Sequence, residues 1–386
     1  MKKILFIGLA EKGEDRSAWS GTCYQTYKSL QRAGFQVDYL SAMRDVKIGF
    51  IEKLMFTYWL KLKQYFHKNI RVDETFYFVR LCSHTLKHFD YSEYDIIFIP
   101  TYLSVVCALP SHIRPKIVHL VDATVDSLFN YYSEFSNLTW HNQLEASFLG
   151  KKAFKKSSLL IASSEWCKQN AIEQYHINPQ KISVIEFGAN IDQSDISAIP
   201  KSLNNKRHLN IYWNGVNWIR KGGNIAVECC EELIKSGYSI TLNITGMKEL
   251  PKECIGKNFI KNFGFFNKNQ TDEYHRLISI IKEQDIFLFP SKAECSSIAL
   301  CEANGFGLPC FVYNTGGTGN YVINGKNGYM LPLNSSGKDF AIKIIQCINS
   351  NELDKLSQGA VKQYKEKLNW SVWTEKVKQQ INNLHI

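Results

Sequence analysis

The chain has 386 residues, of which 45% are apolar or aromatic and 21% are charged. This composition is typical of a folded globular protein and excludes a disordered tail, a collagen-like repeat or a coiled coil. The length predicts two domains, because single cores rarely grow past about 250–300 residues. The 46 Lys and Arg against 36 Asp and Glu give a net charge of +10, which favours a polyanionic partner such as nucleotide phosphates, acidic membrane or nucleic acid.

The cysteines and the lengths of the apolar runs indicate the cellular compartment in which the protein works. The 11 cysteines include no CxxC pair and several lie in apolar runs, so we expect reduced core residues of a cytosolic protein. The apolar start ends at Ala10, which is too short for a signal-peptide core or a membrane span. We therefore expect a cytoplasmic protein that is soluble, or at most peripheral to the inner face of a membrane.

In the first half of the chain, buried strands alternate with helical patterns. After the first strand, Gly21 and Thr22 open a helical pattern that Gly34 ends, and a second strand follows. This βαβ order is typical of a parallel sheet with helices on its faces. The predicted strands of this half are Ile4–Ile7, Val37–Leu40, Ile96–Ile99, Ile117–Leu120 and Leu159–Ala162.

The same rhythm restarts after a polar, linker-like stretch from Asp192 to Arg207. The predicted strands of this half are Leu209–Trp213, Ile240–Ile244, Phe259–Ile260, Ile286–Phe289 and Cys310–Val312. The fold class predicted is therefore α/β, with two doubly wound, Rossmann-like domains. Ligands of such sheets bind at the carboxyl ends of the strands, so a cleft between the two domains could hold two substrates.

Residues 44–68, here called the basic aromatic segment, depart from this rhythm. Aromatic and aliphatic residues interleave with lysines in a helix-like pattern. Such a segment could lie on an anionic bilayer. The alternative is a helix that packs on its own domain and turns a basic face to solvent.

The segment with the most candidate ligand-binding residues runs from Phe289 to Gly319. Glu294 lies in a loop after a predicted strand, and Ser297 can cap the helix that contains Glu302. The start of that helix suits a phosphate, and each carboxylate could accept hydrogen bonds from sugar hydroxyls. Taken alone, two Glu residues eight positions apart favour the alternative without a binding role, in which one is a solvated loop residue and the other a surface residue of the helix.

A second polar loop follows the strand at Trp213. Arg220 and Lys221 are adjacent, and glycines on either side, including Gly215, allow a ligand to approach the backbone. Two cations at such a turn suit a diphosphate and could neutralise charge on a departing pyrophosphate. The alternative is a basic surface turn.

These segments resemble motifs of the family-4 retaining glycosyltransferases of the GT-B type. Glu294 to Glu302 resembles the family's E-x7-E motif, EANGFGLPCFVYNTGG its continuation, and IRKGG its diphosphate loop. WSGT is similar to the family's first-domain loop, and LLIASSEWCKQNAI to the strand and helix that close that domain. ISVIEFGANID is similar to the interdomain connection, and LNWSVWTEKVKQQI to the C-terminal helix. Their order and spacing over nearly the whole chain make the resemblance specific.

The resemblance implies a GT-B fold with three parts. Residues 1–190 would form the acceptor-side domain and residues 191–368 the nucleotide-sugar domain, while residues 369–386 would form a helix that crosses back to the first domain.

The resemblance also implies roles for residues. Glu302 would hold the nucleotide ribose, Glu294 would contact the donor sugar, and Arg220 and Lys221 would face the diphosphate. Where many members have an Arg in the diphosphate loop this chain has Val216, and Arg220 would take its place.

The remaining implied site residues lie in both halves. His119 matches a position where the family often places a His beside the transferred sugar, which gives a catalytic set of His119, Lys221, Arg220 and Glu294. Asp122 and Thr124 would lie on the acceptor side. Further donor contacts would come from Gly21, Thr22, Gly215, Phe265, Ser297, Ile298, Gly316 and Gly317.

The function implied is transfer of a sugar, with retained anomeric configuration, from a UDP- or GDP-sugar to a glycan or lipid-linked acceptor in surface polysaccharide or glycoconjugate synthesis. No DxD motif occurs, so we expect no metal and no other cofactor. The positive charge is scattered, so no nucleic-acid partner is expected. The alternatives are a nucleotide-sugar epimerase of the same architecture and a non-catalytic nucleotide-sugar-binding subunit.

Overall fold

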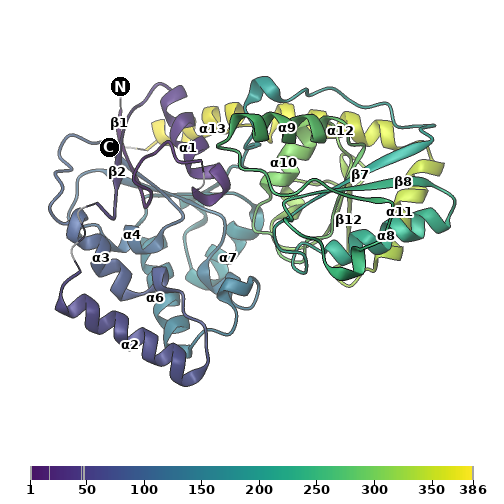
Figure 1. The fold of residues 1–386 in the computed structure, drawn as a ribbon. Coiled ribbons are helices and arrows are strands. Elements are labelled where there is room, and N and C mark those ends of the chain that lie inside the picture. The colour runs from purple at the N-terminus through teal and green to yellow at the C-terminus, as the bar shows by residue number, and fades with distance from the viewer. Residues whose placement is uncertain (1, 17, 45, 47, 385–386) are drawn as a thin grey trace. The chain divides into compact units, whose positions relative to one another are not determined.

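The computed structural model describes residues 2–16, 18–44, 46 and 48–384 (Figure 1). Asp45 and Lys47 of the basic aromatic segment lie outside the described residues. The chain divides into two compact units: the first runs to Ile185 and also takes the chain from Thr374 onward, and the second is Glu186–Trp373. The predicted boundaries at residues 190 and 368 lie close to these positions.

The first unit is built on a six-stranded parallel sheet of order β2-β1-β3-β4-β5-β6. Its strands are β1 (Lys3–Gly8), β2 (Gln36–Ser41), β3 (Ile96–Pro100), β4 (Lys116–Val121), β5 (Leu159–Ala162) and β6 (Ile182–Val184). The five predicted strands are confirmed, and β6 was not predicted. The central strands are buried on both faces, which explains why they read as unbroken apolar runs.

The helices of the first unit surround this sheet. They are α1 (Thr22–Arg32), α2 (Phe50–Phe66), α3 (Phe76–Leu86), α4 (Leu103–Ala108), α5 (Val125–Leu128), α6 (Trp140–Lys156) and α7 (Glu165–Tyr175). Residues of α3, α4, α6 and α7 pack together on one face of the sheet and form the main core of the unit. The last part of α13 (Trp370–Asn382) also belongs here, since Lys2 Nζ donates to the carbonyl of Ile381 at 2.7 Å.

The second unit holds another six-stranded parallel sheet, of order β12-β11-β10-β7-β8-β9. Its strands are β7 (His208–Asn214), β8 (Ser239–Thr245), β9 (Ile260–Asn262), β10 (Ile286–Phe289), β11 (Cys310–Tyr313) and β12 (Gly328–Leu331). The predicted strands are confirmed, with β9 shifted by a residue or two, and β12 was not predicted. One core joins the sheet to α8 (Gly223–Lys235) and α11 (Gly337–Asn349). The other joins it to α9 (Thr271–Lys282), α10 (Ile298–Gly305) and α12 (Leu353–Glu366).

All 11 cysteines are free and buried, as the sequence predicts. Burial raises the pKa of most of their thiols, for example that of Cys82 to about 12. They therefore behave as small apolar core residues.

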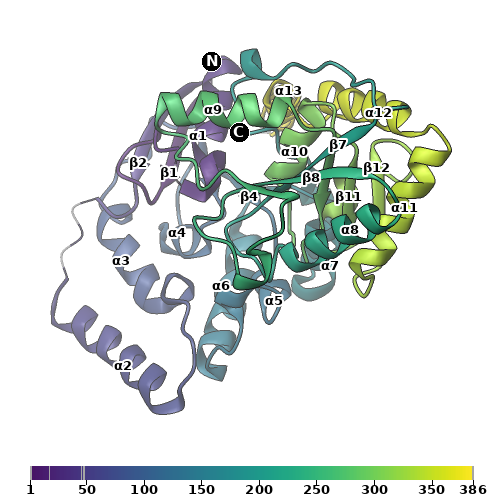
Figure 2. The same ribbon diagram turned by 45° about the vertical axis from the view of Figure 1, so that its right-hand side comes forward.

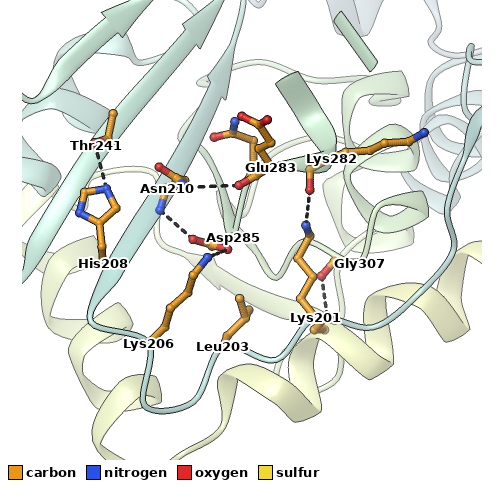
Figure 3. Close-up of polar contacts among 12 residues, drawn as sticks. Lys201, Leu203, Lys206, His208, Asn210, Thr241, Lys282, Glu283, Asp285 and Gly307 are labelled. Atoms are coloured by element: carbon orange, nitrogen blue, oxygen red, sulfur yellow. Dashed lines mark hydrogen bonds and ion pairs between the residues drawn. The ribbon is translucent and has the colours of Figure 1, made fainter. Parts of the chain in front are cut away.

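The polar stretch predicted as a linker is anchored to the second unit. Lys206 Nζ lies 2.6 Å from Asp285 Oδ1, and the backbone N–H of Asn210 donates to Asp285 Oδ2 at 2.8 Å (Figure 3). Lys201 Nζ donates to the carbonyl of Lys282 at 2.7 Å. Asp285 is only 2% exposed, so one buried carboxylate fixes both the start of β7 and the end of the linker.

We expect Asp285→Ala to lower the free energy of unfolding by about 1–2 kcal/mol, because the Asn210 N–H loses its acceptor and Lys206 its partner. Urea unfolding followed by circular dichroism measures this. Asp272→Ala, which removes an exposed acid from the first turn of α9, is the control and should change stability by less than about 0.5 kcal/mol. Equal effects would show that the buried anchor contributes nothing.

Candidate functional site

The strand order of the second unit brings two polar loops together. β7 lies between β8 and β10, and the chain leaves β7 toward one side of the sheet and returns on the other. In open α/β sheets, ligands bind outside the carboxyl ends of the strands at such a switch point. The loops that start there are residues 215–222, after β7, and residues 290–297, after β10.

Tryptophans hold the loop after β7 in shape. The indole Nε1 of Trp213 donates to the carbonyl of Lys221 at 3.0 Å, and the rings of Trp213 and Trp218 lie 5.2 Å apart. Gly215 leaves space for the stem of Lys221, since a Cβ there would lie 2.9 Å from Lys221 Cγ. The loop therefore presents Lys221 in a fixed position.

Gly222 makes the turn that joins this loop to α8. Its φ is +68°, and an added Cβ would lie 2.0 Å from the carbonyl oxygen of Pro290. Only glycine combines this left-handed conformation with so close a contact between the two loops.

Gly222→Ala is expected to destabilise the protein by about 2 kcal/mol, since the two loops must separate to admit the methyl group. Gly237→Ala is the matched control: Gly237 also has a positive φ (+91°), but nothing lies within 4 Å of an added Cβ, so only the backbone cost of about 1 kcal/mol remains. Thermal unfolding of both variants measures the difference. A cost at Gly222 no larger than at Gly237 would contradict the close contact.

Lys221 and Glu294 form a buried ion pair across the two loops. Lys221 Nζ lies 2.5 Å from Glu294 Oε1 and 4.6 Å from the centre of the Phe289 ring. Ser291 Oγ donates to the same carboxylate oxygen at 2.6 Å, and the Glu294 side chain is 5% exposed. Burial lowers the pKa of Lys221, and the Glu294 charge opposes this shift.

Arg220 adds a second cation to this pair. Its Nη1 donates to the carbonyl of Ala293 at 3.1 Å and lies 3.7 Å from Glu294 Oε1. Its backbone N–H is held by Asn217 Oδ1 at 3.0 Å. The two cations share one carboxylate, so the cluster keeps an excess positive charge suited to a phosphate-bearing ligand.

Helix α10 starts directly after this cluster and carries the second carboxylate. Ser297 is its N-cap and accepts a hydrogen bond from the N–H of Leu300 at 3.4 Å. Glu302 is 5% exposed, and Oε1 lies 2.6 Å from Lys268 Nζ. Ile298 is the first residue of α10. The helix thus offers a positive dipole end near the cations and a charged carboxylate one turn further on.

The loop after β11 closes this side of the site. The N–H of Gly317 donates to the backbone carbonyl of Glu294 at 2.9 Å, and Gly316 has a φ of +49°. Phe265 follows Gly264 near the start of the loop after β9 and is 51% exposed. An exposed phenyl ring can stack on a planar base.

In the first unit, the loop before α1 is strained. Trp19, Ser20 and Gly21 have consecutive positive φ values of 50°, 56° and 87°, and Gly21 forms the N-cap of α1 without a side-chain bond. Thr22, the first residue of α1, is 1% exposed. Two non-glycine residues in a left-handed conformation mark a place that the surrounding structure forces into shape, which is common at functional sites.

Asp122 follows the end of β4 and contacts this strained loop. Burial raises the pKa of Asp122 to about 6, partly opposed by hydrogen bonds from its own backbone and from the Trp19 side chain. Thr124 is fully buried and caps α5, where its Oγ1 accepts a hydrogen bond from the N–H of Ser127 at 3.3 Å. Of the two acceptor-side predictions, Asp122 lies directly after its strand and is partly buried, whereas Thr124 is fully buried.

His119 lies inside β4 and not at its end. It is 0% exposed, and its ring faces Phe154 of α6 with the centroids 5.7 Å apart. Burial lowers the pKa of His119 to about 4, partly opposed by the backbone of Thr101, so the ring is neutral near pH 7. Its catalytic role stays a prediction.

Two family profiles match the chain. Residues 22–193 match the family described as Glycosyltransferase Family 4, and residues 201–363 match Glycosyl transferases group 1. Together the two matches cover most of the chain and meet near the boundary between the two units.

The chain belongs to the family-4 glycosyltransferases of the GT-B type. Protein CapJ of Staphylococcus aureus is 24% identical over 237 residues, which are 59% of this chain and 56% of that protein. An Escherichia coli enzyme named UDP-Gal:alpha-D-GlcNAc-diphosphoundecaprenol alpha-1,3-galactosyltransferase is 27% identical over 193 residues, 47% of this chain and 49% of the enzyme. The chain thus spans about half the length of these curated relatives.

The fold of this family-4 glycosyltransferase agrees with solved structures. The Anabaena protein Alr3699/HepE, crystallised with UDP and glucose, superposes with a TM-score of 0.61 at 18% identity and full coverage of both chains. The predicted GT-B class, with a doubly wound α/β architecture in each domain, is therefore confirmed.

The second unit of this glycosyltransferase brings most of the predicted donor residues to one edge of its sheet. Arg220, Lys221 and Glu294 are in direct contact, and Gly215 and Gly317 support them. Sequence reasoning missed two members of the site: Ser291, which holds Glu294, and Lys268, which pairs with Glu302. The only available signal for Ser291 was its place in the loop after β10, and Lys268 lies in a loop without a recognisable motif.

The described part of this glycosyltransferase has neither a cluster of metal-ligating side chains nor a membrane-spanning helix. There, no group of three or more His, Cys, Asp or Glu side chains is placed to hold a metal ion. Likewise, none of the described helices is both long and apolar enough to span a bilayer.

Proposed function

We propose that this protein moves a hexosyl group from a UDP- or GDP-sugar to a glycan or lipid-linked acceptor, with retention of the anomeric configuration. The observation that carries this proposal is the cluster of Lys221, Arg220 and Glu294 at the switch point of the second sheet. The cluster combines an excess of positive charge with a carboxylate, as a sugar diphosphate requires.

Each group of the donor has a partner of suitable chemistry in this proposal. Lys221 and Arg220 neutralise the diphosphate as the bond from the sugar to the phosphate oxygen breaks, and the start of α10 adds its dipole. Glu302 accepts hydrogen bonds from the ribose hydroxyls, Glu294 binds the sugar, and Phe265 stacks on the base. The two cations do the work that a divalent ion does in other transferases, so the reaction proceeds without a metal.

The chemical step then needs little from the protein besides position and charge. The acceptor hydroxyl attacks the anomeric carbon from the face of the leaving group, and a phosphate oxygen of that group takes the proton. The new bond joins the anomeric carbon to the acceptor oxygen, and the nucleoside diphosphate leaves. We propose Asp122 of the first unit, whose pKa is raised by burial, as a residue that contacts the acceptor.

The relatives support the choice of substrates. The Escherichia coli enzyme is named for a UDP-sugar donor and a diphosphoundecaprenol-linked acceptor, and Alr3699/HepE was crystallised with UDP. We infer a role in surface polysaccharide or glycoconjugate synthesis. Free, buried cysteines support a reducing, cytoplasmic compartment for it.

Two measurements test the proposed function. In a thermal-shift screen of UDP, GDP, ADP and their sugars with EDTA present, a ligand at 100 times its Kd should add about 2.7 kcal/mol of stability. The responding donor is then incubated with and without a lipid-linked sugar acceptor, and products are separated by mass spectrometry. Transfer only with acceptor supports the proposal. An isomerised donor without acceptor indicates an epimerase, and binding without either product indicates a non-catalytic subunit.

A further inference from the structure

Helix α2, within the basic aromatic segment, is anchored to its own unit by one face. Trp59 is 4% exposed and packs with Tyr77 and Leu81 of α3. Glu52, also buried, accepts from Arg80 Nε at 2.6 Å and lies 3.1 Å from His84 Nε2. The alternative of a helix packed on its own domain is therefore correct for this inner face.

The opposite face of α2 exposes large apolar side chains. Phe50, Leu54, Tyr58 and Tyr65 are 76%, 54%, 48% and 79% exposed. Their spacing of i, i+4, i+8 and i+15 puts them on one stripe of the helix, and the exposed Lys61 falls at i+11 of the same stripe. A soluble surface helix normally shows polar residues there.

Helix α6 carries a second stripe with the same register. Trp140, Leu144 and Phe148 are 62%, 62% and 56% exposed at i, i+4 and i+8. The exposed Lys151 and Lys155 continue the stripe at i+11 and i+15. Phe76, at the start of α3, is 44% exposed and its ring lies 5.7 Å from that of Phe148, which widens the apolar area.

The two stripes adjoin where α2 ends and α6 begins. Lys68 Nζ donates to Asn137 Oδ1 at 2.7 Å, and the N–H of Asn69 donates to the carbonyl of Asn137 at 2.8 Å. The N–H of Thr139, the N-cap of α6, donates to the carbonyl of Asn69 at 3.2 Å. Figures 1 and 2 show these helix ends side by side at the same margin of the first unit. The exposed residues of both stripes are called the α2–α6 surface below.

The charge of the α2–α6 surface has one sign. The exposed charged side chains of the two stripes are the lysines Lys61, Lys151 and Lys155. The other exposed charged side chains of α2 and α6, and of the segment just after α2, are also lysines: Lys53, Lys63, Lys68 and Lys152. The only acids in the two helices are Glu52, buried in ion pairs, and Glu145, whose carboxylate accepts from the backbone N–H of Phe76. Aromatic rings interleaved with lysines suit the interface of a bilayer, where the rings reach the acyl chains and the lysines reach anionic headgroups.

We propose that the α2–α6 surface binds an anionic lipid bilayer and holds the first unit on it. This goes beyond the proposed sugar transfer and does not depend on it. A second copy of the chain fits the surface poorly, since a symmetric contact would set lysines of one copy against lysines of the other.

Vesicle sedimentation tests the proposal with the full chain. We expect binding to vesicles of phosphatidylcholine with 30% phosphatidylglycerol to be at least about tenfold tighter than to phosphatidylcholine alone, and to weaken in 0.5 M salt. Tyr65→Ser/Trp140→Ser and Lys61→Glu/Lys151→Glu should each weaken it about tenfold or more. Ile255→Ser/Leu333→Ser, which removes two exposed apolar side chains of the second unit, is the matched control and should bind as the wild type.

Two further measurements check that the variants are folded and that they still bind the nucleotide donor. Circular dichroism and the thermal shift with nucleotide should be the same for all variants, because none of the changed residues contacts the donor cluster. Equal binding to both vesicle types, no binding by the wild type, or unchanged binding by the variants would overturn the proposal. So would a dimer in size-exclusion chromatography that the Tyr65→Ser/Trp140→Ser variant converts to a monomer.

Discussion

Lys221→Ala is expected to lower kcat for sugar transfer about 10²- to 10³-fold, the usual effect of removing one contact to a charge that develops in the transition state. Lys221 is held beside Glu294 by the loop after β7, so its charge is already in place when the diphosphate leaves. The donor KM should change less than kcat, because Arg220 still contributes to ground-state binding. Initial rates at varied donor concentration measure both constants.

Two residues of the loop after β10 complete this test: Lys292 provides the control variant, and Glu294 is the ion-pair partner of Lys221. Lys292→Ala removes an exposed cation two residues from Glu294 and should leave kcat within about twofold. Glu294→Gln alone should also lower the rate, and the double variant should lose less than the sum of the two single losses, since each residue acts through the other. A Lys221→Ala enzyme with wild-type kcat would contradict the assigned role.

The direct pairing of Lys221 with Glu294 could not be predicted from the sequence, although both residues could. Each lies in a recognisable motif, but 73 positions separate them along the chain. Their contact depends on β10 pairing with β7, and an alternation of strands and helices does not specify strand order. Ser291 was not predicted for the same reason, because the role of a serine in a loop depends on the residues that it contacts in the fold.

In the first unit, the sequence pattern predicts the secondary structure correctly but not which way individual side chains point. The strand containing His119 was predicted correctly, but β4 continues to Val121 and turns the imidazole toward Phe154 in the core. An apolar run predicts that a strand is buried and does not specify which of its residues reaches the sheet edge. The sequence pattern of α6 does not by itself identify the exposed stripe, because Trp140, Leu144 and Phe148 would also fit the core-facing side of a helix. Only the packing shows that Ala146, Leu149 and Ala153 take that side.

Glu302→Ala is expected to raise the donor KM about 10²-fold with little change in kcat. A carboxylate that accepts hydrogen bonds from two hydroxyls contributes about 1.5–3 kcal/mol, and the ribose does not change during transfer. Glu302 is 5% exposed and already desolvated, so the two hydroxyls meet a preorganised acceptor. Steady-state kinetics with the donor found in the thermal-shift screen measure the effect.

A deoxynucleotide donor separates recognition of the ribose from general damage. The wild type should bind the 2′-deoxy donor more weakly than the ribonucleotide, whereas Glu302→Ala should bind the two alike, because the acceptor of that hydroxyl is gone. Lys268→Met removes the cation that lies 2.6 Å from Glu302 Oε1 and keeps the carboxylate, so it should retain the preference for the ribonucleotide. If Glu302→Ala still prefers the ribonucleotide as strongly as the wild type, then Glu302 does not contact the ribose.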